Sequence, residues 1–234
     1  MAVHGKGARL LANGYEVTSY TKSVVMSQMA DVAETSALQS TNKTYIGGMH
    51  DATLTTEGMF DGQAGAVDQV LAAALGQSGS ELTYYMNGYA IGDYGYGIQG
   101  QESSYEVSSP VDDVTAVTME VQSSVAGERL RSHQPLAAVT GGGTAASTLD
   151  NAAQSLNGGW GYLHCTALTG GTATVKVQHS TDDATYVDLI TFTNVTAANV
   201  SERALSAGTV HRYTRATWTV TGGTATFQVG FGRG

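Results

Sequence analysis

The sequence predicts a mainly β protein: a β-sandwich or barrel with one short flanking helix, followed by a small C-terminal β-sandwich domain. Several segments alternate apolar and polar residues, which is the pattern of strands with one buried face. The chain holds 30 Gly but only two Pro, so glycine must form most of the turns. The sequence TGGTAT occurs twice, at 169–174 and 221–226, within two similar apolar segments. With 234 residues, the chain is long enough for one large β domain or two small ones.

The clearest alternation lies at 52–60 and predicts a strand with two distinct faces. One face takes Ala52, Leu54 and Phe60, and the other takes Thr53, Thr55 and Glu57. The stretch before it, Thr35–Thr44, consists mostly of small polar residues without a period, so it predicts a long loop. Nearer the N-terminus, Asn13-Gly14 predicts a type I′ turn, because both residues accept positive φ angles.

One short helix is predicted over Ala66–Leu75, where Val67, Val70 and Leu71 keep helical spacing and Gly76 stands at the C-cap position. At about 1.5 Å per residue, such a helix spans only about 15 Å. Further strands are predicted at 23–29, 81–86, 102–108 and 114–123. The helix is therefore expected to flank a sheet rather than to form a layer of its own.

The net charge of −9 is carried by the first part of the chain. Residues 1–135 contain six Lys/Arg and 15 Asp/Glu, whereas residues 136–234 contain five of each. An acidic surface does not bind nucleic acid, since affinity for phosphates comes from Lys and Arg. It would suit the wall of a channel through which DNA slides without sticking.

Three predicted strands carry glutamate on the face opposite their apolar residues. The glutamates concerned are Glu57, Glu102 or Glu106, and Glu120. One interpretation is an ordinary solvated outer face. The other is a shared acidic surface, and the spacing does not decide whether that surface is convex or lines a lumen.

The domain boundaries follow from a change in composition. Residues 137–158 are rich in Ala, Gly, Thr and Ser without a period, which predicts a linker or extended arm between domains at 1–136 and 159–234. In the second domain, each TGGTAT sequence predicts a strand, a Gly-Gly turn and a strand. Trp160 and Trp218 are its expected core aromatics.

No catalytic, cofactor or metal site is predicted, and the chain is not expected to be an enzyme. The six His lack metal-ligand spacing, and His164 and Cys165 are neighbours on a strand, so their side chains point to opposite faces. The glycine–tyrosine run at 88–100 lacks the GK[ST] sequence of a phosphate-binding loop. The chain has no apolar run near 18 residues and no signal peptide, so we expect synthesis in a cytoplasm.

One basic and aromatic cluster stands out in the second domain, formed by Arg203, Arg212 and Arg215 with Tyr213 and Trp218. The first interpretation is ordinary surface charge, because Arg212 and Arg215 have opposite strand parity and would project to different sides. The second is a patch that contacts a glycan or another surface.

The order of these features resembles a known family. The resemblance covers roughly residues 8–130 and is carried by NGYEVTSYTKSV, AETSALQSTNKTYIGGMHDATLTTEGMFD, AVDQVLAAAL and YGIQGQESSYEVSSPVDDVTAVTMEVQSS. In these blocks the first domain is similar to the major tail tube proteins of long, non-contractile-tailed bacteriophages. The VQHSTDDATYVDLITF segment of the second domain is similar to small decoration or carbohydrate-binding modules.

The family implies a tail-tube-type β fold whose copies form hexameric rings, stacked into the tube that conducts DNA from capsid to host. It implies no catalytic residue and no cofactor. The unpatterned loop would reach the adjoining ring through Thr35, Ser36, Leu38, Gln39, Asn42, Lys43 and Thr44. The lumen-facing residues would be Glu57, Glu102, Glu106 and Glu120.

The implied partners are further copies of the chain, the tape measure protein, and the tail terminator and distal tail proteins. DNA would be met only in passing, no membrane would be involved, and the protein would be located in the virion after synthesis in the host cytoplasm. Two alternatives stay open. One is another virion protein that decorates the capsid or joins head to tail, and the other is a carbohydrate-binding β module.

Overall fold

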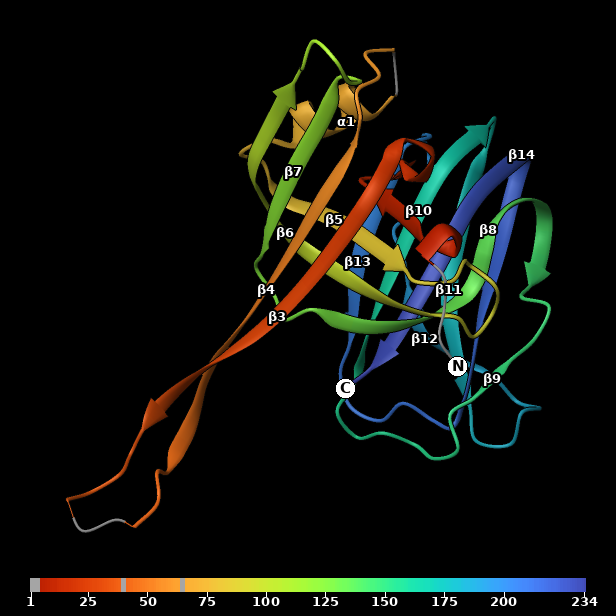
Figure 1. The fold of residues 1–234 in the computed structure, drawn as a ribbon. Coiled ribbons are helices and arrows are strands. Elements are labelled where there is room, and N and C mark those ends of the chain that lie inside the picture. The colour runs from red at the N-terminus through yellow and green to blue at the C-terminus, as the bar shows by residue number, and fades with distance from the viewer. Residues whose placement is uncertain (1–4, 39–40, 64–65) are drawn as a thin grey trace.

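The computed structural model describes residues 5–38, 41–63 and 66–234 (Figure 1). Two 3-10 turns, at Gly5–Gly7 and Thr18–Tyr20, accompany one α-helix, α1 (Val67–Ala74), in these residues. The strands are β1 (Arg9–Ala12), β2 (Tyr15–Glu16), β3 (Thr21–Glu34), β4 (Tyr45–Met59), β5 (Ser78–Tyr85), β6 (Tyr94–Ser108), β7 (Ala116–Ser123), β8 (Glu128–Thr144), β9 (Leu149–Asp150), β10 (Gly159–Thr169), β11 (Thr172–Ser180), β12 (Val187–Thr191), β13 (Val200–Ser206) and β14 (Tyr213–Arg233). The prediction of a mainly β protein with one short helix is confirmed.

The first half of the chain, from β1 to β7, surrounds one hydrophobic core. Its strands pair antiparallel in the orders β3-β4-β7-β6 and β6-β5-β1-β2. Leu54, Leu82, Ile98 and Met119 are buried between them, and α1 adds Leu71 from the side. None of the helices in the described residues is long and apolar enough to cross a membrane.

Two local predictions for this half are confirmed. The helix forms where its apolar spacing predicts it, and Gly76 follows its C-cap residue with a φ of +73°. Asn13 and Gly14 have φ angles of 49° and 83°, which are the positive values that a type I′ turn requires. Phe60 differs from its prediction, because β4 ends at Met59 and the ring lies exposed instead of on the core face.

The second half surrounds a separate core between two layers of strands, with β13, β10 and β14 in one and β12, β11 and β14 in the other. Its buried aromatic side chains are Phe192, Phe227 and Phe231. Trp160 was predicted in this core but lies half-buried on the opposite face of β10 from Leu163. The other predicted core aromatic, Trp218, is half-buried at the rim and packs edge-on against Phe227.

The linker prediction is wrong for residues 137–144, which form the second half of β8. They pair with β14 from Ala137 opposite Phe227 to Thr144 opposite Thr217. A run of small residues without a period carries no strand signal of its own, and here the long partner strand supplies its hydrogen bonds. The start of β8 also pairs with β6, so one strand joins the sheets of both cores. The domain boundaries at 136 and 159 stay a prediction.

The two TGGTAT sequences adopt different structures. Gly170 and Gly171 form the predicted turn between β10 and β11 with positive φ angles. Gly222 and Gly223 instead lie inside β14, at an irregularity where the strand leaves β11 and joins β10. A Cβ atom on Gly171 or Gly223 would overlap a carbonyl oxygen of the facing segment. The prediction of a second hairpin is therefore wrong. Gly222 and Gly223 instead let β14 pass close to the turn between β10 and β11.

Candidate assembly surfaces

The β4-β7-β6 sheet has one acidic face. Glu57 of β4 lies opposite Thr118 of β7, which lies opposite Glu106 of β6. Residues that pair across antiparallel strands point to the same side, so Glu57 and Glu106 share a face. Glu120 alternates with the buried Met119 and Val121 and therefore points to that face as well. We call this set of Glu57, Glu106 and Glu120 the acidic face; no salt bridge engages it within the described residues.

Glu102, which alternation placed on the same face, lies in the core instead. The register shifts between Glu102, opposite Val121, and Ser104, opposite Glu120, so Ser103 is an extra residue that forms a bulge. The bulge turns Glu102 to the side of Val121, where it is only 2% exposed. Neither carboxyl oxygen has a hydrogen-bond partner among the described residues. Burial raises the pKa of this carboxyl group to about 8, because the charged form is poorly solvated there.

The β3–β4 hairpin projects from the sheet at the lower left of Figure 1. Its distal part, beyond the pairing of Gln28 with Ala52, is exposed on both strands. Met29 and Met49 are 69% and 78% exposed. Further exposed apolar residues of this part are Val32, Tyr45 and Ile46. A two-stranded ribbon with this much apolar surface in water is marginally stable without a partner.

The predicted contact loop forms the tip of this hairpin. Thr35, Ser36, Leu38, Asn42, Lys43 and Thr44 lie there, whereas Gln39 lies outside the described residues. The amide of Thr44 donates to the Ser36 hydroxyl over 3.0 Å, and Lys43 forms a 3.0 Å salt bridge with Glu34. These bonds join the two sides of the tip to each other among its described residues.

Each arginine of the basic and aromatic cluster is bound within the chain. Arg212 donates to both carboxylate oxygens of Asp150, over 2.7 and 2.5 Å, and its guanidinium lies 4.9 Å from the ring centre of Tyr213. Arg215 donates to the Gln178 side chain over 3.0 and 2.9 Å and lies 3.6 Å from the ring centre of Tyr186. The described residues contain no group of His, Cys, Asp and Glu side chains arranged to hold a metal ion.

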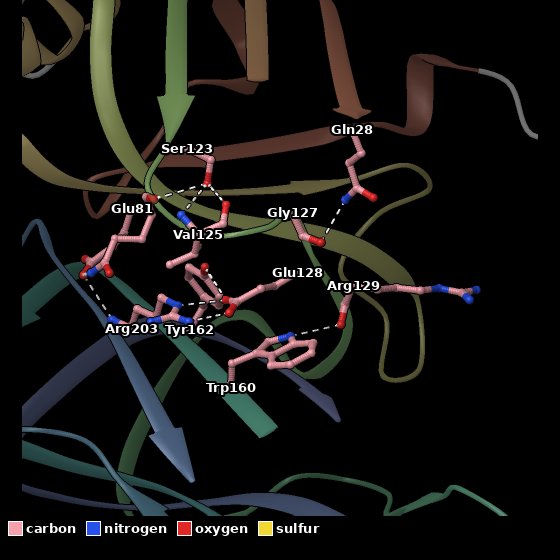
Figure 2. Close-up of polar contacts among 11 residues, drawn as sticks. Gln28, Glu81, Ser123, Val125, Gly127, Glu128, Arg129, Trp160, Tyr162 and Arg203 are labelled. Atoms are coloured by element: carbon pink, nitrogen blue, oxygen red, sulfur yellow. Dashed lines mark hydrogen bonds and ion pairs between the residues drawn. The ribbon is translucent and has the colours of Figure 1, made fainter. Parts of the chain in front are cut away.

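A buried polar cluster joins the two halves of the chain (Figure 2). The sequence singled out only its Arg203, as a member of the basic and aromatic cluster, and nothing in the sequence pointed to the partners of Arg203. Glu128, at the start of β8, accepts hydrogen bonds from the Tyr162 hydroxyl over 2.7 Å and from Arg203 Nε over 2.8 Å. The second guanidinium nitrogen of Arg203 pairs with the other carboxylate oxygen. Glu128 is 7% exposed, and its hydrogen bond and charge raise the pKa of Arg203.

Glu81 of β5 extends this cluster on the other side. It accepts from the Ser201 hydroxyl over 2.5 Å and from the Arg203 amide over 3.1 Å. Two further bonds cross the same boundary: Gln228 donates to the Tyr85 hydroxyl over 2.7 Å, and the Gly14 amide donates to His164 over 3.3 Å. Directional hydrogen bonds among buried groups permit few alternative arrangements, so they fix how the two cores pack together.

No protein-family model and no curated protein sequence matches this chain. Several solved structures do align with parts of this chain. A chain in the virion of a native gene transfer agent particle is 15% identical with a TM-score of 0.45, over 54% of this chain and 97% of that one. A chain in the PVC sheath-tube complex of an extracellular contractile injection system, in its extended state, is 11% identical with a TM-score of 0.44, over 56% and 92%.

The SPP1 Dit protein, described as a paradigm of the hub adsorption apparatus in phages that infect Gram-positive bacteria, is 10% identical with a TM-score of 0.36. That alignment covers 96% of this chain and 98% of Dit. All three similarities have identities of 15% or less and TM-scores below 0.5.

The first prediction concerns Glu102 and pH. The folded protein keeps Glu102 protonated up to about pH 8, whereas the unfolded chain releases that proton near pH 4.5. Stability is therefore highest below pH 4.5 as far as this group is concerned, and it falls as pH rises to 8 by an amount on the order of 4 kcal/mol. Glu102→Gln should remove this slope in urea unfolding between pH 5 and 8. Glu120→Gln should keep it, and equal slopes in wild type and Glu102→Gln would contradict the assignment.

The second prediction concerns the buried cluster. Arg203→Ala leaves Glu128 buried without its counter-charge, which should lower the free energy of unfolding by about 3–5 kcal/mol. Arg212→Ala removes the exposed pair with Asp150 and is the matched control, with a much smaller expected change. Urea unfolding at pH 7 measures both. Similar losses in the two variants would mean that the cluster does not hold the halves together.

Proposed function

We propose that the chain is a structural subunit of a bacteriophage tail tube and assembles with further copies of itself. The observation that carries the proposal is the β3–β4 hairpin, whose distal apolar side chains touch neither core. Burying one such side chain against another chain stabilises a contact by about 1.5–3 kcal/mol. A hairpin of this composition therefore favours a protein whose working state is an assembly.

Two open strand edges support assembly into a ring. Along its whole length β3 pairs with β4 alone, and β6 from Ser104 to Ser108 pairs with β7 alone. These edges lie at opposite sides of the β3-β4-β7-β6 sheet. Joining the β3 edge of one copy to the β6 edge of the next would satisfy both, and a closed ring would leave no edge exposed. We propose six copies per ring, as in the family that the sequence resembles.

In this ring the acidic face would line the lumen. Glu57, Glu106 and Glu120 project from the three strands that such a ring would join into a barrel. Negative charge on the wall would repel DNA phosphates, so DNA would pass without binding. The hairpin tip at 35–44 would contact the adjoining ring, and the second core would lie outside the tube.

The further partners would be the tape measure protein inside the tube and the tail terminator and distal tail proteins at its ends. In this proposal the protein would be located in the virion after synthesis in the host cytoplasm, and it would have no catalytic role. The alternatives of a capsid decoration or head–tail joining protein would use the same hairpin in a single ring. A carbohydrate-binding role has less support, because Arg212 and Arg215 are already bound to Asp150 and Gln178.

The third prediction tests the hairpin. Changing Met29, Ile46 and Met49 to Ser should leave a folded monomer, because these side chains contact neither core. If each is buried in the assembly, the triple change removes about 5 kcal/mol from each contact, which is more than a thousandfold in the association constant. Light scattering after size exclusion and negative-stain electron microscopy of concentrated protein measure this.

The matched control changes three exposed apolar residues of the second half, Leu156, Val187 and Leu205, to Ser. Wild type and the control should form rings or tubes, and the hairpin variant should not. Equal assembly of the hairpin variant, or a wild type that stays monomeric at high concentration, would sink the proposal. Single rings that never stack would favour the head–tail joining alternative.

The fourth prediction tests the acidic face. Glu57→Lys combined with Glu120→Lys should permit assembly but make the tubes retain double-stranded DNA at low salt, because lysine binds phosphates. Asp182→Lys combined with Asp183→Lys makes the same charge change on an exposed loop of the second half. Fluorescent DNA retained inside assembled tubes should rise for the first variant only. Equal retention in both variants would count against a luminal position of the acidic face.

A further inference from the structure

A pocket of about 380 Å³ opens where the start of β6 and the early part of β8 meet the end of β14. Three arginines line it: Arg129, Arg131 and Arg233. Figure 2 shows Arg129 pointing away from its neighbour Glu128, which the buried cluster engages. The pocket therefore gathers positive charge on a chain whose net charge is −9.

These three guanidinium groups have only neutral partners. Within the described residues none of them forms a salt bridge, whereas Lys43, Lys176, Arg203 and Arg212 each do. Arg131 donates over 3.4 Å to the Gly92 carbonyl and over 3.4 Å to the Asn151 side chain. Arg233 donates to the backbone carbonyls of Asn151 and Ala153. The Arg129 guanidinium lies 4.4 Å from the centre of the Tyr94 ring.

The carboxylate that lines the pocket does not neutralise these arginines. Asp150 is held by Arg212 through two hydrogen bonds. Burial, and after it the nearby positive charge of Arg131, lower the pKa of Arg233. Even with a carboxylate at Gly234, two positive charges would remain in excess. A bound anion would relieve this repulsion and accept the unused N–H groups.

We propose that this pocket binds a small organic oxyanion, a carboxylate or a phosphate ester of about monosaccharide size. A guanidinium group offers paired donors that match both oxyanions. The volume of the pocket lies in the range of small-molecule pockets, roughly 300–1,000 Å³, and is larger than a free phosphate ion would fill. The half-exposed Tyr94 ring offers a contact for the rest of such a molecule, and Asn151 and Ser155 line the pocket beside it. The inference is independent of the proposed assembly.

The experiment is isothermal titration of the full chain with glucuronate, glucose 6-phosphate and inorganic phosphate, with glucose as the neutral control, at one fixed ionic strength. Saturable binding of at least one organic anion is expected, and none of glucose. Arg131→Gln and Arg233→Gln should each weaken binding at least tenfold. Arg215→Gln, a partly buried arginine outside the pocket, should leave it unchanged.

Arg129→Gln changes an exposed side chain and should also weaken binding, so binding can still be compared if Arg131→Gln or Arg233→Gln fails to fold. Binding of inorganic phosphate as tight as that of the organic anions would overturn the organic ligand and assign a free anion to the arginines. Absence of saturable binding by folded wild type would overturn the site altogether. The site would also be overturned if Arg129→Gln and the folded pocket variants bound the organic anions as tightly as the wild type does.

Discussion

The structure depends on one strand pair, β8 with β14, that belongs to both halves of the chain. β8 begins beside β6 of the first half, where Arg131 lies opposite both Tyr94 and Phe231, and then follows β14 to Thr144. Because the hydrogen bonds of one strand serve two sheets, the halves cannot separate without exposing backbone groups. The Glu128–Arg203 cluster lies at the point where β8 enters this shared position. Its polarity makes the junction specific in geometry, whereas the two apolar cores supply most of the free energy.

Two buried glutamates show two ways to accommodate a carboxyl group inside this fold. Glu128 has partners on both of its carboxylate oxygens, which accept hydrogen bonds from Arg203 and Tyr162. Glu102 has no partner among the described residues and is held protonated by the apolar surroundings. The first arrangement fixes a contact between distant strands. The burial of Glu102 makes the stability of the first core depend on pH. This burial results from the single bulge at Ser103.

The parts of the molecule also differ in whether their groups find partners within the chain. The cores and their junction are buried, while the distal hairpin and two strand edges are open, and neither the acidic face nor the arginine pocket has an opposite charge paired with it in the described chain. Exposed apolar residues and open edges favour contacts with other copies of the chain. The arginine pocket differs, since its opening is polar and its missing partner is a negative charge.

Local features of the sequence determined the class of fold, the helix at α1, the type I′ turn at Asn13-Gly14 and the two faces of β4 around Leu54. Each depends on spacing or on backbone angles within a few residues, so the chain carries the information locally. Only the tertiary structure decided that 137–144 is a strand, that Gly222 bends β14 instead of closing a hairpin, and that Trp160 lies outside the core. It also decided the burial of Glu102 and the meeting of Glu128 with Arg203. A bulge, a long strand pairing or a buried ion pair depends on partners far along the chain, which no periodicity can reveal.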